Sequence, residues 1–176
     1  MNLNPVYPEY QQVGAGFSTS WGEIEFHSEV AWHDTRDQLQ DDDYLSYVLG
    51  SRYSFYRIPW SETIDEITLT LEYVGESIMR QQTAGSAYLS TGFGRALTNS
   101  FLNRLVFKFS EETSLEVGSF INLDQNDYSA QIKGTHRPSD TLEYSFSLDA
   151  FEGPVGSFFG EWSNNHRASL AMTYYF

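Results

Sequence analysis

Alternate residues of the segment GEIEFHSEVAWH (22–33) place two carboxylates and an imidazole on one side of the chain. Glu25, His27 and Glu29 are side-chain types that can hold Zn²⁺ or another divalent ion. In an extended strand, however, alternate residues lie roughly 6.5 to 7 Å apart, which is too far for three adjacent ligands on one metal ion. The pattern therefore predicts a polar row along a strand and no metal site, and we expect no cofactor.

Charged side chains recur at alternating positions in most other extended segments, between apolar residues that point the opposite way. If these segments form a barrel, the charged positions face its interior. In a narrow barrel they would pair and fill the lumen, whereas in a wide barrel they would line water and set ion selectivity. The predicted lumen-facing residues are Glu25, His27, Glu29, Arg52, Glu72, Arg104, Lys108, Glu116, Lys133, Glu143 and Asp149.

Other chemistry-bearing residues give weaker signals. His33 and His166 fall where an outer rim is expected, but nothing marks a nucleophile, so we do not predict an enzyme. The acidic loop 34–43 could bind Ca²⁺ or Mg²⁺, but it lacks the EF-hand spacing and its glycine, which favours a solvated loop. The segment STGFGR (90–95) has no strand–helix context, so phosphate binding is not expected.

A period of two residues runs through almost the whole chain and predicts an all-β fold without helices. Short and long connections alternate, with long ones expected at 34–43, 75–98 and 153–165, as in barrels that have turns at one rim and loops at the other. Nine strands are expected, at 12–21, 22–33, 44–56, 66–73, 100–110, 114–124, 128–135, 141–151 and 166–176.

The composition suits such a barrel better than a soluble domain. The 176 residues are 40 % hydrophobic and 16 % aromatic, with no cysteine and a net charge of −14. The mean hydropathy is −0.42. A barrel that alternates lipid-facing and lumen-facing residues averages to such a polar value. The acidity argues against nucleic acid as a partner, because phosphate contacts require a basic surface.

The last segment, RASLAMTYYF (167–176), carries a family resemblance. It resembles the C-terminal signature strand of bacterial outer-membrane β-barrel proteins, in which apolar residues at alternate positions precede a terminal phenylalanine. The resemblance implies that the barrel-assembly machinery reads Leu170, Met172, Tyr174 and Phe176. The order of segments between 22 and 73 also resembles the last third of large porin-like barrels.

An outer-membrane barrel would meet the lipid bilayer and lipopolysaccharide through its outer surface. Aromatic residues near strand ends are typical of the girdles that lie at the headgroup level. We expect Trp32, Tyr44, Trp60, Tyr73, Tyr128, Tyr174 and Phe176 in these girdles.

The chain is expected to be one domain, an antiparallel up-and-down transmembrane β-barrel of about 8–10 strands with residues 1–11 as an extension. Nine is odd, whereas a complete bacterial barrel has an even number of strands. Either one strand is miscounted or the chain is the C-terminal part of a larger barrel. A miscount would leave eight strands, with 1–20 as an extension, or ten strands, with 86–93 as the additional one. In the case of a larger barrel, a longer parent chain or a second polypeptide supplies the remaining strands. The segment MNLNPVYPEY (1–10) does not read as a signal peptide, which favours the larger barrel.

The predicted function is a porin-like pore in the bacterial outer membrane that passes solutes by passive diffusion through a charged lumen. Three alternatives stay open. The first is a non-conducting barrel whose loops 75–98 and 153–165 contact a partner, and the second is an enzyme active at the rim. The third is a soluble acidic β-sandwich that binds sugar on Trp60 and Trp162.

Overall fold

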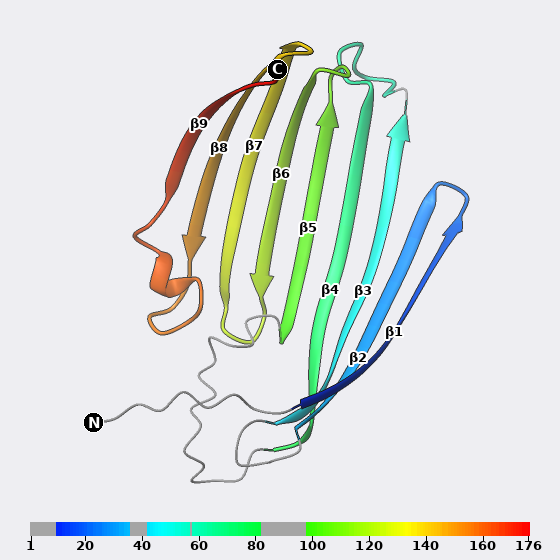
Figure 1. Ribbon diagram of the computed structural model, residues 1–176, viewed down its shortest axis with the longest axis vertical. Coiled ribbons are helices and arrows are strands. Elements are labelled where there is room, and N and C mark those ends of the chain that lie inside the picture. The colour runs from blue at the N-terminus through cyan, green and yellow to red at the C-terminus, as the bar shows by residue number, and fades with distance from the viewer. Residues whose placement is uncertain (1–9, 36–41, 57, 82–97) are drawn as a thin grey trace.

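The structure is a computed structural model that describes residues 10–35, 42–56, 58–81 and 98–176. These residues form a single antiparallel sheet of nine strands whose spatial order follows the sequence (Figure 1). The strands are β1 (Tyr10–Trp21), β2 (Ile24–Thr35), β3 (Asp43–Tyr56), β4 (Glu66–Arg80), β5 (Asn99–Lys108), β6 (Thr113–Asn122), β7 (Asp127–Ser139), β8 (Leu142–Glu152) and β9 (Arg167–Tyr174). One turn of 3-10 helix, η2 (Gly160–Trp162), lies between β8 and β9.

Several predicted boundaries move. β1 begins at Tyr10, so the extension expected over 1–11 is too long, and the eight-stranded alternative with an extension over 1–20 is wrong. β4 continues to Arg80, which makes 75–80 strand and not loop. The proposed tenth strand at 86–93 lies outside the described residues.

The connections differ between the two ends of the sheet. Segments 22–23, 57–65, 109–112 and 140–141 join strands at the end where the C-terminus lies, and 36–42, 81–98, 123–126 and 153–166 join them at the other end. Gly22 has φ of +62° and lets β1 turn directly into β2, because a residue without Cβ adopts this conformation at little cost.

In the β5–β6 turn, Ser110 Oγ donates a hydrogen bond to the Glu112 carboxylate at 2.7 Å, and this bond lowers the pKa of that carboxyl.

The sheet curves but does not close among the described residues. β1 and β9 are its two edges, at opposite margins of the sheet (Figure 1). The up-and-down antiparallel prediction is confirmed, whereas closure into a barrel is absent from the described sheet. All nine strands belong to one sheet, so the two-sheet sandwich is wrong. In an up-and-down sheet with an odd number of strands, the two edge strands run in the same direction.

The register separates two faces of opposite character, because residues paired across strands point to the same side. One row crosses all nine strands and is entirely apolar: Trp21, Ile24, Tyr53, Leu69, Leu105, Val117, Ile132, Leu148 and Ala168. We call this side the apolar face. The row one residue further along is mostly polar: Glu25, Arg52, Thr70, Arg104, Gly118, Gln131, Asp149 and Arg167. We call that side the polar face.

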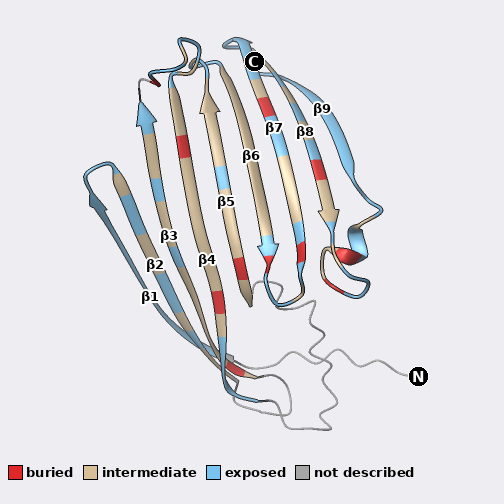
Figure 2. Ribbon diagram, turned by 180° about the vertical axis from the view of Figure 1, so that it is seen from behind, coloured by how far each residue is buried: buried red, intermediate tan, exposed pale blue. Residues whose placement is uncertain are grey.

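The apolar face is not covered by any second layer of the described residues. Ile58 is the one hydrophobic side chain buried in the described part of the chain, whereas Leu49 is 55 %, Phe17 65 % and Leu170 89 % exposed. Figure 2 shows buried positions only as isolated segments, and β1 and β9 are exposed along their described residues. A water-soluble domain of this size buries its Leu, Ile and Phe side chains in a core. Here the buried residues are mostly polar, Asp127 and Asp149 among them.

Candidate functional site

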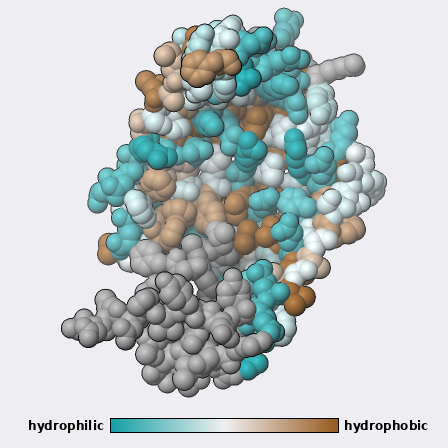
Figure 3. Space-filling view, in the orientation of Figure 1, coloured by the Kyte–Doolittle hydropathy of each residue, from teal (hydrophilic) through white to brown (hydrophobic). Residues whose placement is uncertain are grey.

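The polar face is hollowed and carries every residue expected to face a lumen. By register, all of the predicted residues from Glu25 to Asp149 project from this one face. Three hollows of about 650, 630 and 520 Å³ lie along it and are lined mainly by its side chains. Figure 3, which has the orientation of Figure 1, shows hydrophilic and apolar side chains side by side on the molecular surface.

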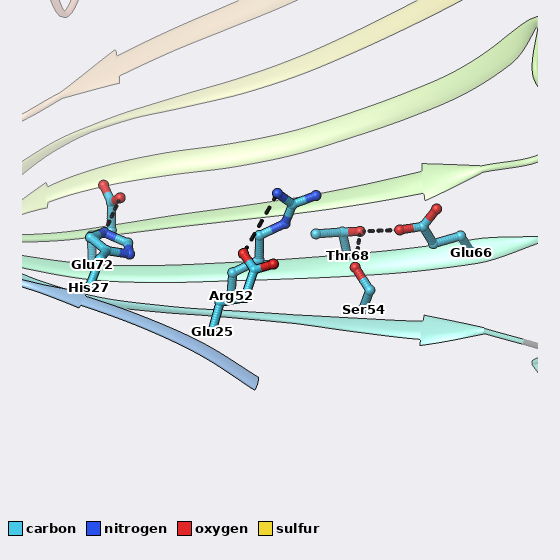
Figure 4. A network of polar contacts seen from close by, with 7 residues as sticks. All are labelled: Glu25, His27, Arg52, Ser54, Glu66, Thr68 and Glu72. Atoms are coloured by element: carbon cyan, nitrogen blue, oxygen red, sulfur yellow. Dashed lines mark hydrogen bonds and ion pairs between the residues drawn. The ribbon is translucent and has the colours of Figure 1, made fainter. Parts of the chain in front are cut away.

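The contact between His27 and Glu72 spans three strands. His27 Nε2 lies 3.0 Å from Glu72 Oε1, although β3 runs between their strands (Figure 4). Gly50 of β3 lies in register with both residues and makes room for the imidazole. A Cβ on Gly50 would sit 2.1 Å from His27 Nε2, so any larger residue would displace the ring.

The same part of the polar face holds two further contacts (Figure 4). Arg52 approaches Glu25 at 4.0 Å, and both side chains are more than half exposed, so this ion pair contributes little to stability. Thr68 Oγ1 donates to Glu66 Oε1 at 2.8 Å and lies 2.9 Å from Ser54 Oγ. These contacts form a polar lining that follows the sheet.

The centre of the polar face is held by a short ion pair. Arg104 Nη2 donates to Glu116 Oε2 at 2.6 Å, between neighbouring strands β5 and β6. Lys133 of β7 is in register with Glu116, and Lys108 lines the neighbouring hollow. The basic and acidic residues therefore alternate across the sheet, which limits like-charge repulsion on the polar face.

Asp149 connects the last three strands. Its Oδ1 accepts a hydrogen bond from Gln131 Nε2 of β7 at 2.5 Å, and its Oδ2 accepts one from Arg167 Nε of β9 at 2.9 Å. Asp149 is only 7 % exposed, so the carboxylate depends on these donors to replace water. Nearer the end of the sheet where the C-terminus lies, Arg137 Nη2 donates to Glu143 Oε2 at 2.7 Å. Glu29 lines the hollow at the opposite end of the polar face.

The two histidines expected at the outer rim lie near opposite edges of the sheet, and residues 36–41 of the acidic loop lie outside the described residues. His33 Nε2 lies 3.2 Å from Ser46 Oγ and its ring stacks on Tyr44, but within the described residues no carboxylate orients it. His166 lies by Glu152 at 3.9 Å, at the far edge of the sheet. Asp43, expected in a solvated loop, is 2 % exposed and pairs with Arg80 at 2.9 Å. The described residues contain no group of three or more metal-ligating side chains.

The aromatic girdle prediction is partly wrong. Tyr44 lies on the polar face, because it has the opposite strand parity to Leu45. Trp32, Tyr73, Tyr128 and Tyr174 lie on the apolar face.

Residues near the C-terminus have the expected orientation. Leu170, Met172 and Tyr174 project from the apolar face, and Phe176 is fully exposed beyond β9, with its ring edge-on to Tyr174 at 5.6 Å. Their role in assembly stays a prediction.

Trp60 and Trp162 cannot form one sugar platform. Trp60 lies in the β3–β4 connection, whereas Trp162 lies in η2 at the opposite end of the sheet.

Sequence reasoning missed the way in which the β8–β9 connection lies against the polar face. Phe159 of this connection contacts Phe120 and Phe151, and its N–H donates to Asp127. A signal was present, since Phe120 and Phe151 each project from the side of their strand that otherwise carries polar or small residues. The alternation of side chains along a strand does not reveal which residue packs against these rings.

Comparisons with known proteins add no relative. No family model matches the chain, and no match was found among curated proteins or solved structures. Among the described residues, no helix has the length and apolar character needed to cross a membrane. The class of protein is therefore argued from the two faces of the sheet.

Proposed function

We propose that this chain forms the wall of a transmembrane β-barrel in the bacterial outer membrane and that the barrel is a porin-like pore. The observation that carries the proposal is the unbroken apolar row from Trp21 to Ala168, which lies one residue away from a row that is mostly polar. Lipid acyl chains would cover the apolar face and remove its exposed side chains from contact with water.

Charge placement on the apolar face supports a lipid environment. Leaving aside the last two residues at each strand end, the apolar face of the nine described strands carries no Asp, Glu, Lys or Arg. The charges found there, Asp34, Asp43 and Glu152, lie at strand ends, where headgroups and water are accessible. A charged side chain at the bilayer midplane of a barrel costs roughly 2–4 kcal/mol, which explains such an exclusion.

The polar face supports passive diffusion of small hydrophilic solutes. Its ion pairs join strands that are neighbours or one strand apart, so they line the wall and leave the hollows open. Acidic side chains outnumber basic ones on this face, which favours cations over anions. The acids are Glu25, Glu29, Glu66, Glu72, Glu76, Glu116, Asp127, Glu143 and Asp149, and the bases are Arg52, Arg104, Lys108, Lys133, Arg137 and Arg167.

A bilayer requires that both sheet edges be paired. Unpaired N–H and C=O groups in hydrocarbon cost several kcal/mol each, so β1 and β9 cannot face lipid as edges. Because these two strands run in the same direction, β1 and β9 can close only as a parallel pair, whereas an all-antiparallel barrel needs an odd number of further strands. Such strands would come from the segment 86–93, which lies outside the described residues, from a longer parent chain or from a second polypeptide.

A non-conducting barrel is the second candidate, and the contacts of Phe159 favour it. This side chain and its loop occupy part of the hollowed polar face, as expected where a barrel is closed to solutes. In that case the connections at this end would contact a partner.

The lipid environment can be tested with two neighbouring residues of β9. Leu170 and Ala171 are both exposed, but Leu170 lies on the apolar face and Ala171 on the polar face. In a bilayer, we expect Leu170→Lys to lower the free energy of unfolding by roughly 2–4 kcal/mol, and Ala171→Lys to change it by less than about 0.5 kcal/mol. Urea-induced unfolding in lipid vesicles, followed by tryptophan fluorescence, measures both. Equal effects of the two lysines would overturn the membrane proposal.

Closure and conduction need separate measurements. Gel mobility with and without boiling reports closure, since a closed barrel resists SDS until it is heated. Planar-bilayer recording then tests conduction, and reversal potentials in a salt gradient test the preference for cations. A closed barrel without conductance would support the second candidate and exclude the pore.

A further inference from the structure

Among the described residues, the polar face contains an apolar patch on which the β8–β9 connection rests. Leu102, Phe120 and Phe151 lie in one row of the polar face, separated only by Ser129. The ring of Phe159 meets Phe120 edge-on at a centroid distance of 5.2 Å and stacks near Phe151 at 6.2 Å. These distances are typical of favourable aromatic pairs. The segment 153–166, which we call the β8–β9 loop, therefore folds inward over the wall.

Two hydrogen bonds donated by backbone N–H groups hold the loop against the β6–β7 turn and the start of β7. The N–H of Phe159 donates to Asp127 Oδ2 at 2.6 Å, and the N–H of Phe158 donates to Gln125 Oε1 at 2.9 Å. Asp127 is fully buried beneath the loop, so its carboxylate has exchanged water for this donor. An N–H bonded to an ionised carboxylate is stronger than a neutral hydrogen bond.

The conformation of the loop requires glycine at two positions and is stabilised by hydrogen bonds of Ser157. A Cβ on Gly160 would lie 1.9 Å from the carbonyl oxygen of Pro154, and one on Gly153 would lie 2.4 Å from Cβ of Asp127. Ser157 Oγ donates to the Pro154 carbonyl at 2.8 Å and accepts from the N–H of Gly160 at 3.1 Å. The loop is thus internally bonded in the shape that brings Phe159 to the polar face.

The space beside the loop is the hollow of about 520 Å³. Phe120 and Phe151 form its apolar side, and Glu72, Arg104 and Glu116 form its charged side. A solute moving along the polar face at this end would pass between an aromatic surface and this charged group. Apolar rings repel hydrated ions and narrow the wetted part of a pore.

We propose that the β8–β9 loop is the constriction of the pore, with Phe159 as the residue that sets its aperture and Asp127 as the positioning residue that holds the loop inward. The inference rests on the proposed pore function. It predicts that small hydrophilic solutes pass and that larger ones are excluded at this level. Releasing the loop should raise the conductance and the largest solute size that passes, while the strands of the barrel stay paired.

The experiment compares four variants of the full chain, refolded in the same detergent. Phe159→Ala removes the ring, and Asp127→Ala removes the acceptor of the Phe159 N–H. Asp127→Asn keeps an acceptor oxygen and should rescue the loop position. Val155→Ala alters a fully exposed residue of the same loop and serves as the matched control.

Hydrogen exchange measures the position of the loop independently of conduction. In Asp127→Ala, we expect the amides of Phe158 and Phe159 to exchange about fivefold to tenfold faster, because one hydrogen bond to a charged group is lost. Exchange in β6 and β7 should stay unchanged, and so should exchange of the loop in Val155→Ala. Unchanged exchange in Asp127→Ala would overturn the positioning role of Asp127.

Single-channel conductance, with polyethylene glycols of increasing size as blockers, measures the aperture. Higher conductance and a larger size limit in Phe159→Ala and Asp127→Ala, but not in Val155→Ala, would support the constriction. A silent, closed wild type with conducting Phe159→Ala would overturn the pore and would identify the loop as the plug of a non-conducting barrel. Equal conductance in the wild type and all variants would overturn the constriction and leave the pore intact. Silence in every variant, despite a heat-dependent gel shift, would overturn the pore and the constriction together.

Discussion

Replacing Gly50 by alanine tests whether the polar face depends on a contact that crosses a whole strand. The added Cβ would lie 2.1 Å from His27 Nε2 and 2.2 Å from its Cε1, so the imidazole must rotate away from Glu72. Both side chains are about one-third exposed, at 32 % and 31 %, which reduces the value of the lost contact to about 0.5–1 kcal/mol. Moving the ring off its rotamer costs about 0.5–1.5 kcal/mol more.

Alanine also offsets part of this cost, because glycine in a strand is less favourable by roughly 0.5–1 kcal/mol. We therefore expect Gly50→Ala to lower the free energy of unfolding by about 1 kcal/mol. Gly16→Ala is the matched control, since it lies on the same face and its Cβ would meet Glu29 Cγ at an ordinary 3.5 Å. The control should be neutral or stabilising by about 0.5 kcal/mol.

The assay is urea-induced unfolding in lipid vesicles or detergent, followed by tryptophan fluorescence, for a double-mutant cycle. In a His27→Ala background the ring is absent, so Gly50→Ala should become neutral or slightly stabilising. The coupling energy between the two sites should then be about 1–1.5 kcal/mol. If Gly50→Ala costs the same with and without the His27 ring, the steric reasoning is refuted.

Two further predictions concern the edge strand and a turn. Asp149→Asn should lower the free energy of unfolding by about 1–2 kcal/mol, since Arg167 and Gln131 lose a shared carboxylate. Hydrogen exchange in β9 should become faster. Unaltered exchange in β9 would show that this carboxylate does not hold the strand. Asn126 has φ of +53°, so Asn126→Ala should destabilise the β6–β7 turn by about 1 kcal/mol, whereas Asn126→Gly should be tolerated. Equal thermal midpoints for the two Asn126 variants would contradict the backbone explanation.

The alternation of side chains predicted the two faces because it is a local property of an extended chain. Once a segment is a strand, residues two apart share a face, so the sides of Arg104 and Leu105 follow without knowledge of neighbouring strands. Segments with a clean period were therefore placed well. Residues 75–80 have no such period, so the sequence predicts a loop there, although pairing with β3 holds most of this stretch in β4 and Gly75 also pairs with β5.

Errors arose where a residue's neighbours on other strands decide its role. Tyr44 was expected in a girdle because it lies near a strand end, but its parity directs it to the polar face, where it stacks on His33. Asp43 was expected in solvent because its sequence neighbours are acidic, but β4 brings Arg80 to within 2.9 Å.

The sequence by itself determined most strand positions, their alternating faces and the apolar C-terminal strand, since each depends on residues close together along the chain. The predicted alternation of connection lengths holds only in part, because 57–65 is long at the end with short turns and 123–126 is short at the end with long loops. The tertiary structure decided the open edges at β1 and β9, the His27–Glu72 contact across Gly50, and the bonding of Asp149 to both neighbouring strands. It also decided that the β8–β9 loop folds inward onto Phe120 and Phe151. These features join residues tens of positions apart, and their energies depend on register and sheet curvature, which no local period specifies.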